Sequence, residues 1–112
     1  MAEDCIFCKI IKGDIPSTKV YEDDKMIAIN DVAPAAPVHV LLMPKDHTAN
    51  ITTADHELVA YMLGKVKMIA EKTGIAEKGF RVVINTGDEG GQTVKHLHIH
   101  VIGGKALGWP PC

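Results

Sequence analysis

Three histidines alternate with aliphatic residues near the C-terminal end of the chain, in the run His96-Leu97-His98-Ile99-His100-Val101-Ile102. In a β-strand, alternate side chains point to the same face and lie roughly 6.5–7 Å apart along it. A strand over 96–102 therefore places three imidazoles on one face and packs aliphatic residues on the other. Imidazole can act as a nucleophile, a proton donor or a metal ligand. This strand therefore predicts a catalytic or metal-binding site on one face, with the other face packed in the core.

The rest of the chain predicts an α+β domain with a five-stranded, mainly antiparallel sheet. We expect strands at 18–21, 26–29, 38–43, 80–84 and 96–102, with a hairpin turn at 22–25. Apolar residues at steps of three and four predict one long helix over 53–72, with Thr53 as its N-cap and Gly74 as its stop. A short helix should cover 6–11. The 112 residues fit a single domain, 1–112, with enough apolar residues for one core.

Composition excludes several classes of partner. The formal net charge of −2 gives no electrostatic footprint for nucleic acid or for an anionic membrane. Two Phe, two Tyr and one Trp are few for base-stacking platforms. No apolar run approaches the ~20 residues of a membrane helix, and the acidic start Met1-Ala2-Glu3-Asp4 lacks the layout of a signal peptide. We therefore expect a cytoplasmic protein, with a nuclear location also open.

A glycine-rich segment, 87–93, directly precedes the histidine strand. Its three glycines allow backbone N–H groups to close around an anion, and the Thr93 hydroxyl can add a donor. Alone, such a loop is more often a tight turn. Next to three histidines it indicates chemistry on a phosphate.

The N-terminal region contains a C-x-x-C pair, Cys5 and Cys8, whose spacing lets two thiolates reach one zinc ion. A closed tetrahedral site requires two further ligands. The alternative is a pair of reduced cysteines on a helical turn. We interpret Cys112 as a terminal thiol and His56 as a helix-surface residue.

The histidine run resembles the signature of the histidine triad (HIT) family. The run Gly90-Gly91-Gln92-Thr93-Val94 and the ending Trp109-Pro110-Pro111 are similar to its Hint branch, the purine nucleoside phosphoramidases. The resemblance covers nearly the whole chain, and the Trp-Pro-Pro ending favours this branch over the diadenosine polyphosphate hydrolases. It implies a HIT-like fold and hydrolysis of adenosine 5′-phosphoramidates to AMP through a covalent nucleotidyl-histidine.

The resemblance also implies roles for individual residues. His98 would attack the α-phosphorus, His100 would face the leaving group and His39 would support them. Asp31 would hold the ribose hydroxyls. The nucleotide would further contact Asn85, Gly91, Gln92 and Thr93 on the phosphate side, and an apolar clamp around the base made of Ile6, Phe7, Ile10, Ile29 and Val32. Each clamp residue could equally be simple core.

The zinc-containing members of the superfamily complete the cysteine pair with two histidines, which here match His47 and His96. Zinc at Cys5, Cys8, His47 and His96 would be structural, and catalysis would need no cofactor. Hint relatives are homodimers, so we expect a C2 dimer in which the tail near Trp109 reaches the partner's active site. Two alternatives stay open, namely a dinucleoside polyphosphate hydrolase and a non-catalytic nucleotide-binding scaffold dimer.

Overall fold

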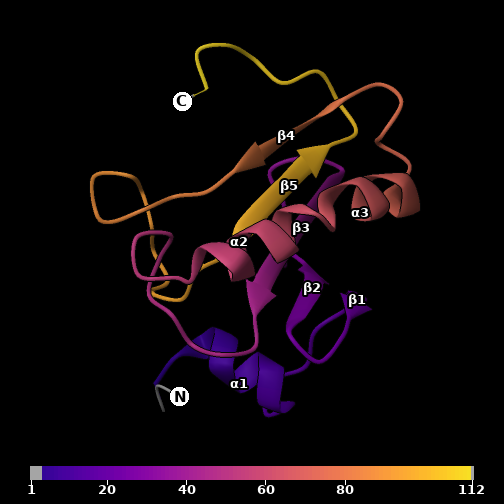
Figure 1. The fold of residues 1–112 in the computed structure, drawn as a ribbon. Helices are drawn as coiled ribbons and strands as arrows, with labels where there is room; N and C mark the ends of the chain where they lie inside the picture. Colours follow the sequence, from indigo (N-terminus) through magenta and orange to yellow (C-terminus); the bar gives the residue numbers. More distant parts are fainter. Residues whose placement is uncertain (1–3, 112) are drawn as a thin grey trace.

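The computed structural model describes residues 4–111, so Cys112 and the first three residues of the chain lie outside it. A helix near the N-terminus is followed by three strands, two consecutive helices and two further strands (Figure 1). The elements are α1 (Ile6–Lys12), β1 (Lys19–Glu22), β2 (Met26–Asn30), β3 (Val38–Pro44), α2 (His56–Leu63), α3 (Val66–Thr73), β4 (Phe80–Val83) and β5 (Ile99–Gly103).

The five strands form one antiparallel sheet with the order β1-β2-β3-β5-β4. The central pair, β3 and β5, sets Leu41 opposite His100 and His39 opposite Ile102. These pairings confirm the predicted fold class. They also bring His39 within one diagonal step of His100, although the two residues are far apart in the sequence.

The two faces of the sheet carry different layers. Met26, Val40, Leu42 and Ile99 are fully buried in a core shared with α2 and α3. The alternate residues of β2 and β3 pack instead against α1, in a smaller core made of Cys5, Phe7, Cys8, Ile27, Ile29, Leu41 and Met43. Figure 1 shows α1 close to the N-terminus and apart from the α2–α3 pair. The histidines of β5 and of the segment before it belong to the face that carries α1.

The long helix begins later than predicted and is interrupted. Thr53 is not its N-cap, because the Asp55 carboxylate accepts the Glu57 N–H at 2.9 Å and the helix starts at His56. Thr53 instead shares a hydrogen bond with the Thr48 hydroxyl. At Gly64 one turn tightens, separating α2 from α3, and Gly74 ends α3 in the left-handed region as predicted.

The histidine strand is also shorter than predicted. Regular pairing of β5 with β3 starts at Ile99, opposite Leu42, so His96 and His98 lie in the segment that leads into the strand. The ladder ends near Pro44, which has no N–H to donate. The alternation nevertheless persists, since Leu97 and Ile99 are buried in the α2–α3 core while the histidines face the other way. Within residues 4–111, no helix is long and apolar enough to cross a membrane.

Candidate active site and metal cluster

The tautomer of the His98 ring is set by the backbone of its own segment. Its Nδ1 lies 2.7 Å from the carbonyl oxygen of His96, and a carbonyl can only accept. Nδ1 therefore carries the proton, which leaves Nε2 with a lone pair. The side chain is 6% exposed, and the Phe7 ring packs edge-on against it with centroids 5.0 Å apart. A lone pair on Nε2 of a buried imidazole can act chemically as a nucleophile.

His39 and His100 form a hydrogen-bonded pair beside His98. The backbone N–H of Ala35 donates to Nδ1 of His39 at 3.0 Å, so the proton of His39 resides on Nε2. That Nε2 lies 2.8 Å from Nδ1 of His100 and donates to it. The remaining proton of His100 is therefore on Nε2. The ring centroids of His98 and His100 are 5.0 Å apart, which brings a hydrogen-bond donor beside the His98 ring.

The pKa of His100 is lowered to about 4, mainly by burial and further by the neighbouring His98 and His39. The Asp31 carboxylate acts in the opposite direction and raises it. His100 is thus neutral at pH 7. One Asp31 oxygen lies 3.5 Å from Nε2 of His39, and the other accepts the Ala33 N–H at 2.8 Å. The His39 and His100 nitrogens lie 2.8 Å apart, which is a hydrogen-bond distance. Two nitrogens bound to the same tetrahedral zinc ion would lie farther apart, at about 3.3 Å.

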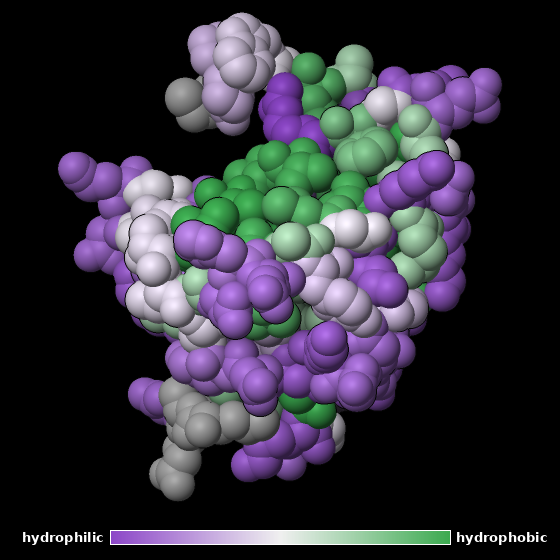
Figure 2. All heavy atoms as spheres, viewed as in Figure 1, coloured by the Kyte–Doolittle hydropathy of each residue, from purple (hydrophilic) through white to green (hydrophobic). Residues whose placement is uncertain are grey.

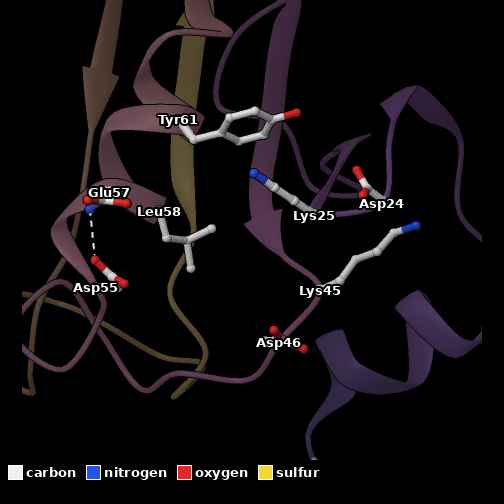
Figure 3. A pocket seen from close by; sticks show the side chains of 8 residues that line it. All are labelled: Asp24, Lys25, Lys45, Asp46, Asp55, Glu57, Leu58 and Tyr61. Atoms are coloured by element: carbon white, nitrogen blue, oxygen red, sulfur yellow. Dashed lines mark hydrogen bonds between the residues drawn. The ribbon is translucent and has the colours of Figure 1, made fainter.

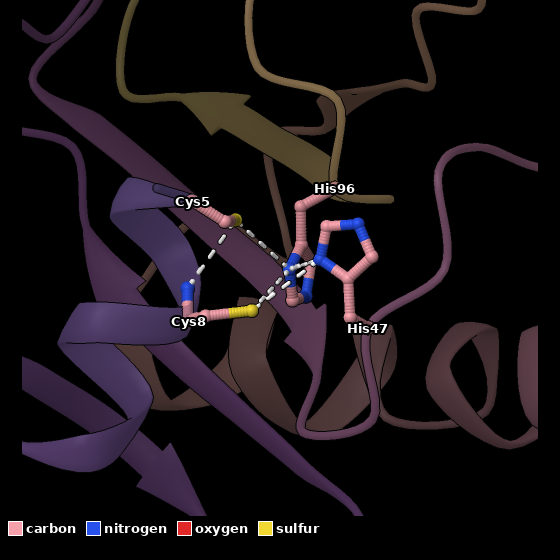
Figure 4. Close-up of side chains that lie close together, drawn as sticks. All are labelled: Cys5, Cys8, His47 and His96. Carbon is pink, nitrogen blue, oxygen red and sulfur yellow. Dashed lines mark hydrogen bonds between the residues drawn. The ribbon is translucent and has the colours of Figure 1, made fainter. Parts of the chain in front are cut away.

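A second cluster joins Cys5, the N-cap of α1, and Cys8 of α1 to His47 and His96 (Figure 4). Nδ1 of His96 lies 3.4 Å from the Cys5 sulfur and 3.6 Å from the Cys8 sulfur. Nδ1 of His47 lies 3.3 Å from the Cys8 sulfur and 3.1 Å from Nδ1 of His96. The fold therefore brings all four predicted ligands together.

Four distances within the cluster are close to those between the ligands of a tetrahedral zinc site. Bonds of about 2.3 Å to sulfur and about 2.0–2.1 Å to nitrogen give S···N edges of about 3.6 Å and an N···N edge of about 3.3 Å. Nε2 of His96 lies 2.9 Å from the Pro44 carbonyl oxygen and donates to it, which leaves Nδ1 as a lone pair toward the sulfurs. Metal-binding histidines usually have such a backbone partner on the second nitrogen. Burial likewise lowers the pKa of His96 and favours the neutral ring that a metal requires.

The glycine-rich loop is braced by the side chain of Gln92. Its amide oxygen accepts the Gly87 N–H at 3.0 Å, and its amide nitrogen donates to the carbonyls of Ala49 and Val94 at 2.7 and 2.9 Å. Gln92 is 5% exposed, so its side chain is turned into the protein and contact with a ligand would come from its backbone.

The loop is further closed by Asn85, whose amide donates to the Gly90 carbonyl at 2.8 Å. Only glycine fits at position 90, because the Cβ of any other residue would overlap the Thr86 carbonyl oxygen. Gly91 has a positive φ of 78°, which favours glycine. Thr93 is exposed and lines a pocket of about 320 Å³ together with Cys5, Ile6 and His47.

The predicted base-clamp residues fall into two groups. Val32 is 96% exposed and Ile6 is 47% exposed, so both apolar side chains stand at the surface. Phe7 and Ile29 are buried in the α1 core, and Ile10 packs against it. Beside the end of β2, Asp31 and Val32 line a pocket of about 340 Å³ with Asn30 and the segment 16–18.

A pocket of about 370 Å³ lies elsewhere, between α2 and the β1–β2 turn (Figure 3). It is lined by Asp24, Lys25, Lys45, Asp46, Asp55, Glu57, Leu58 and Tyr61, and contains none of the histidines. Two of its charges are already engaged, since Lys45 pairs with Glu22 at 2.8 Å and Asp55 caps α2. None of the site residues predicted from the sequence lines this pocket.

Two groups of the site were not predicted, and both belong to the backbone. The Ala35 N–H fixes the tautomer of His39, and the Pro44 carbonyl fixes that of His96. No side-chain pattern could reveal them, because any residue type supplies the same carbonyl and nearly any supplies the same N–H.

The sequence matches the family model "HIT domain" over residues 12–107. The chain belongs to the HIT family. It is 55% identical over 114 residues to an uncharacterised HIT-like protein of Synechococcus elongatus, covering 99% of each chain. It is 46% identical to a 14 kDa zinc-binding protein of Brassica juncea, covering 96% of this chain and 99% of that one. It is also 46% identical to a protein of Arabidopsis thaliana named adenylylsulfatase HINT1, covering 95% of this chain and 75% of that one.

Solved structures agree with this assignment. A HIT family hydrolase of Legionella pneumophila superposes with a TM-score of 0.93 at 43% identity, covering 97% of this chain and all of that one. Together with the plant relatives, this similarity supports the Hint branch of the HIT family.

Proposed function

We propose that this HIT protein, as one domain over 1–112, hydrolyses the P–N bond of adenosine 5′-phosphoramidates to give AMP. The observation that carries the proposal is the hydrogen bond from Nδ1 of His98 to the His96 carbonyl, which leaves Nε2 as a nucleophile. Nε2 of His98 forms a bond to the α-phosphorus while the P–N bond breaks. The amine leaves with the bonding electron pair and takes up a proton. Water then cleaves the nucleotidyl-imidazole, releases AMP and restores His98.

His100 assists as a neutral donor. Its Nδ1 accepts from His39, whose own tautomer is fixed by Ala35, so its Nε2–H is directed away from His39. The lowered pKa of His100 agrees with this state. A neutral N–H positioned beside the nucleophile donates a hydrogen bond to the leaving nitrogen and stabilises the charge that develops there.

The nucleotide would occupy the surface between Asp31 and the glycine-rich loop. Asp31 would accept from the ribose hydroxyls, while exposed Val32 and Ile6 would cover the base. Backbone N–H groups of the loop around Gly91 would bind the phosphate.

The proposal is tested with three AMP conjugates, namely an adenosine 5′-phosphoramidate with a fluorescent amine, adenylyl sulfate and a diadenosine polyphosphate. We expect the phosphoramidate to be hydrolysed fastest, and we expect mass spectrometry to detect AMP on His98 in protein quenched with base, because a P–N bond to imidazole is labile in acid. The matched control is the variant His56→Ala, which removes an exposed histidine at the start of α2 instead of one from the proposed site. Faster cleavage of adenylyl sulfate would make this chain an adenylylsulfatase like its named plant relative. Faster cleavage of the dinucleotide would favour the polyphosphate hydrolase, and binding without cleavage would favour the scaffold.

We further propose that the Cys5, Cys8, His47 and His96 cluster holds one structural zinc ion per chain, which supplies folding energy by joining α1 to the histidine segment. The S···N distances and the Pro44 partner of His96 support this assignment. Metal analysis of protein purified without added zinc is the test. Protein without zinc, whose Cys5 and Cys8 are both readily alkylated, would contradict it.

A homodimer is the third part of the proposal. Leu63 of α2 and Phe80 and Val82 of the sheet edge β4 are 37–42% exposed. Figure 2 shows an apolar area on the face where the α2–α3 layer and the β4 edge lie. An edge strand with exposed apolar residues favours pairing with a second copy. Light scattering at micromolar concentration should give a dimer, and deletion of 109–112 should change the relative rates among amines without removing the His98 adduct.

A further inference from the structure

The Phe7 ring joins the cysteine–histidine cluster to His98. Phe7 lies between Cys5 and Cys8 on α1, and its side chain is 8% exposed. Its ring meets the His98 ring edge-on at 5.0 Å and 84°, and the His96 ring edge-on at 5.9 Å and 76°. One side chain therefore contacts both a residue of the cluster and the proposed nucleophile.

The placement of this ring depends on how α1 is held. The helix has seven residues, too few to be stable in isolation. Its first turn is attached at Cys5, which caps it by accepting the Cys8 N–H at 3.4 Å. The two sulfurs in turn lie 3.3–3.6 Å from the imidazoles of His47 and His96. The cluster is therefore joined directly to the segment that carries Phe7.

The proposed nucleophile depends on the same cluster through the backbone. His98 donates to the carbonyl of His96, and the ring of His96 is held by the Pro44 carbonyl on its far side. The carbonyl fixes the tautomer of His98 through one hydrogen bond. The edge-on Phe7 ring adds a packing contact to the imidazole on the side of α1.

We propose that Phe7 is a positioning residue, which transmits the state of the Cys5, Cys8, His47 and His96 cluster to the imidazole of His98. Zinc bound there, by fixing α1, would hold the His98 ring in its attacking orientation. The role of His98 rests on the proposed function, whereas its orientation can be measured independently of it.

The experiment uses the full chain in four forms, wild type and Phe7→Leu, each loaded with Zn²⁺ and each stripped with a chelator. The matched control is Ile11→Ala, which removes packing from the same helix at a side chain outside the proposed site. Circular dichroism verifies folding, and Phe7→Met replaces Phe7→Leu if the latter is unfolded. The first readout is the Nδ1–H signal of His98 in protein labelled with ¹⁵N-histidine. The second is the rate of AMP-adduct formation in a single turnover.

In wild type, zinc removal should broaden or shift the His98 signal and slow adduct formation at least about tenfold. In Phe7→Leu both effects should already be present with zinc bound, and removal should add less than about twofold, because coupled perturbations are not additive. Ile11→Ala should respond to zinc as wild type does. Equal losses on zinc removal in wild type and Phe7→Leu would overturn the proposal, as would a zinc-loaded Phe7→Leu that matches Ile11→Ala. If wild type forms no adduct, the proposed function fails, and the His98 signal alone decides the role of Phe7.

Discussion

The side chain of Gln92 offers a sensitive test of how the glycine-rich loop is held in place. Its amide makes three hydrogen bonds, accepting from Gly87 and donating to Ala49 and Val94. Gln92→Glu preserves the shape of this side chain and the bond from Gly87. It removes both donated bonds and places a carboxylate against two carbonyl oxygens.

The cost follows from the bonds that are lost. A net hydrogen bond contributes about 1 kcal/mol, and more when its partner stays buried and unsatisfied. Two lost bonds and the charge facing two carbonyls should lower the free energy of unfolding by about 3 kcal/mol at pH 7. For a domain of this size, that lowers the melting temperature by about 10 °C or more. The introduced carboxyl group would have a raised pKa in the folded state, so the deficit should shrink as the pH falls and the group regains a proton.

Thermal unfolding at one protein concentration, at pH 7 and again near pH 5, measures this deficit. Steady-state kinetics should show a raised KM with a smaller change in kcat, because the loop proposed to bind the phosphate would be displaced while His98 would not. The control is Glu89→Gln, on an exposed side chain of the same loop, which should change stability by less than about 0.5 kcal/mol. A Gln92→Glu protein as stable as this control at pH 7 would refute the bracing role of the amide.

Three further predictions concern the site itself. His98→Ala should reduce turnover at least about a thousandfold while nucleotide affinity changes little, and a variant that keeps a tenth of the wild-type rate would exclude His98 as the nucleophile. The pKa of His100 should be near 4 by NMR titration, below the ordinary 6.5. Because its folded-state pKa is depressed, wild type should lose more stability than His100→Asn as the pH falls from about 6.5 to about 4, and equal losses would contradict the assignment. Gly90→Ala should displace the loop, since its Cβ would overlap the Thr86 oxygen, and unchanged nucleotide affinity would argue against that.

Periodicity and spacing predicted the parts of this fold that local rules determine. The alternation of His98 and Ile99 places them on opposite faces because successive residues of an extended chain do so with or without a partner strand. The start of β5 was wrong by three residues, since pairing depends on where β3 reaches Pro44, and that is a long-range property. The N-cap was wrong because Asp55 and Thr53 are both good caps, and sequence alone does not rank two acceptors that lie two residues apart.

The residue types of the candidate site were readable from the sequence, whereas their protonation states required the fold. Three imidazoles of identical chemistry each meet a different backbone atom. A carbonyl directs the proton of His98 to Nδ1, another directs that of His96 to Nε2, and the Ala35 N–H excludes a proton from Nδ1 of His39. These three contacts leave a lone pair where a nucleophile needs one, a lone pair where a metal needs one and a donor directed at His100. Since the main chain makes this division of roles, a substitution that shifts it should impair the site even when all six histidines of the chain are retained.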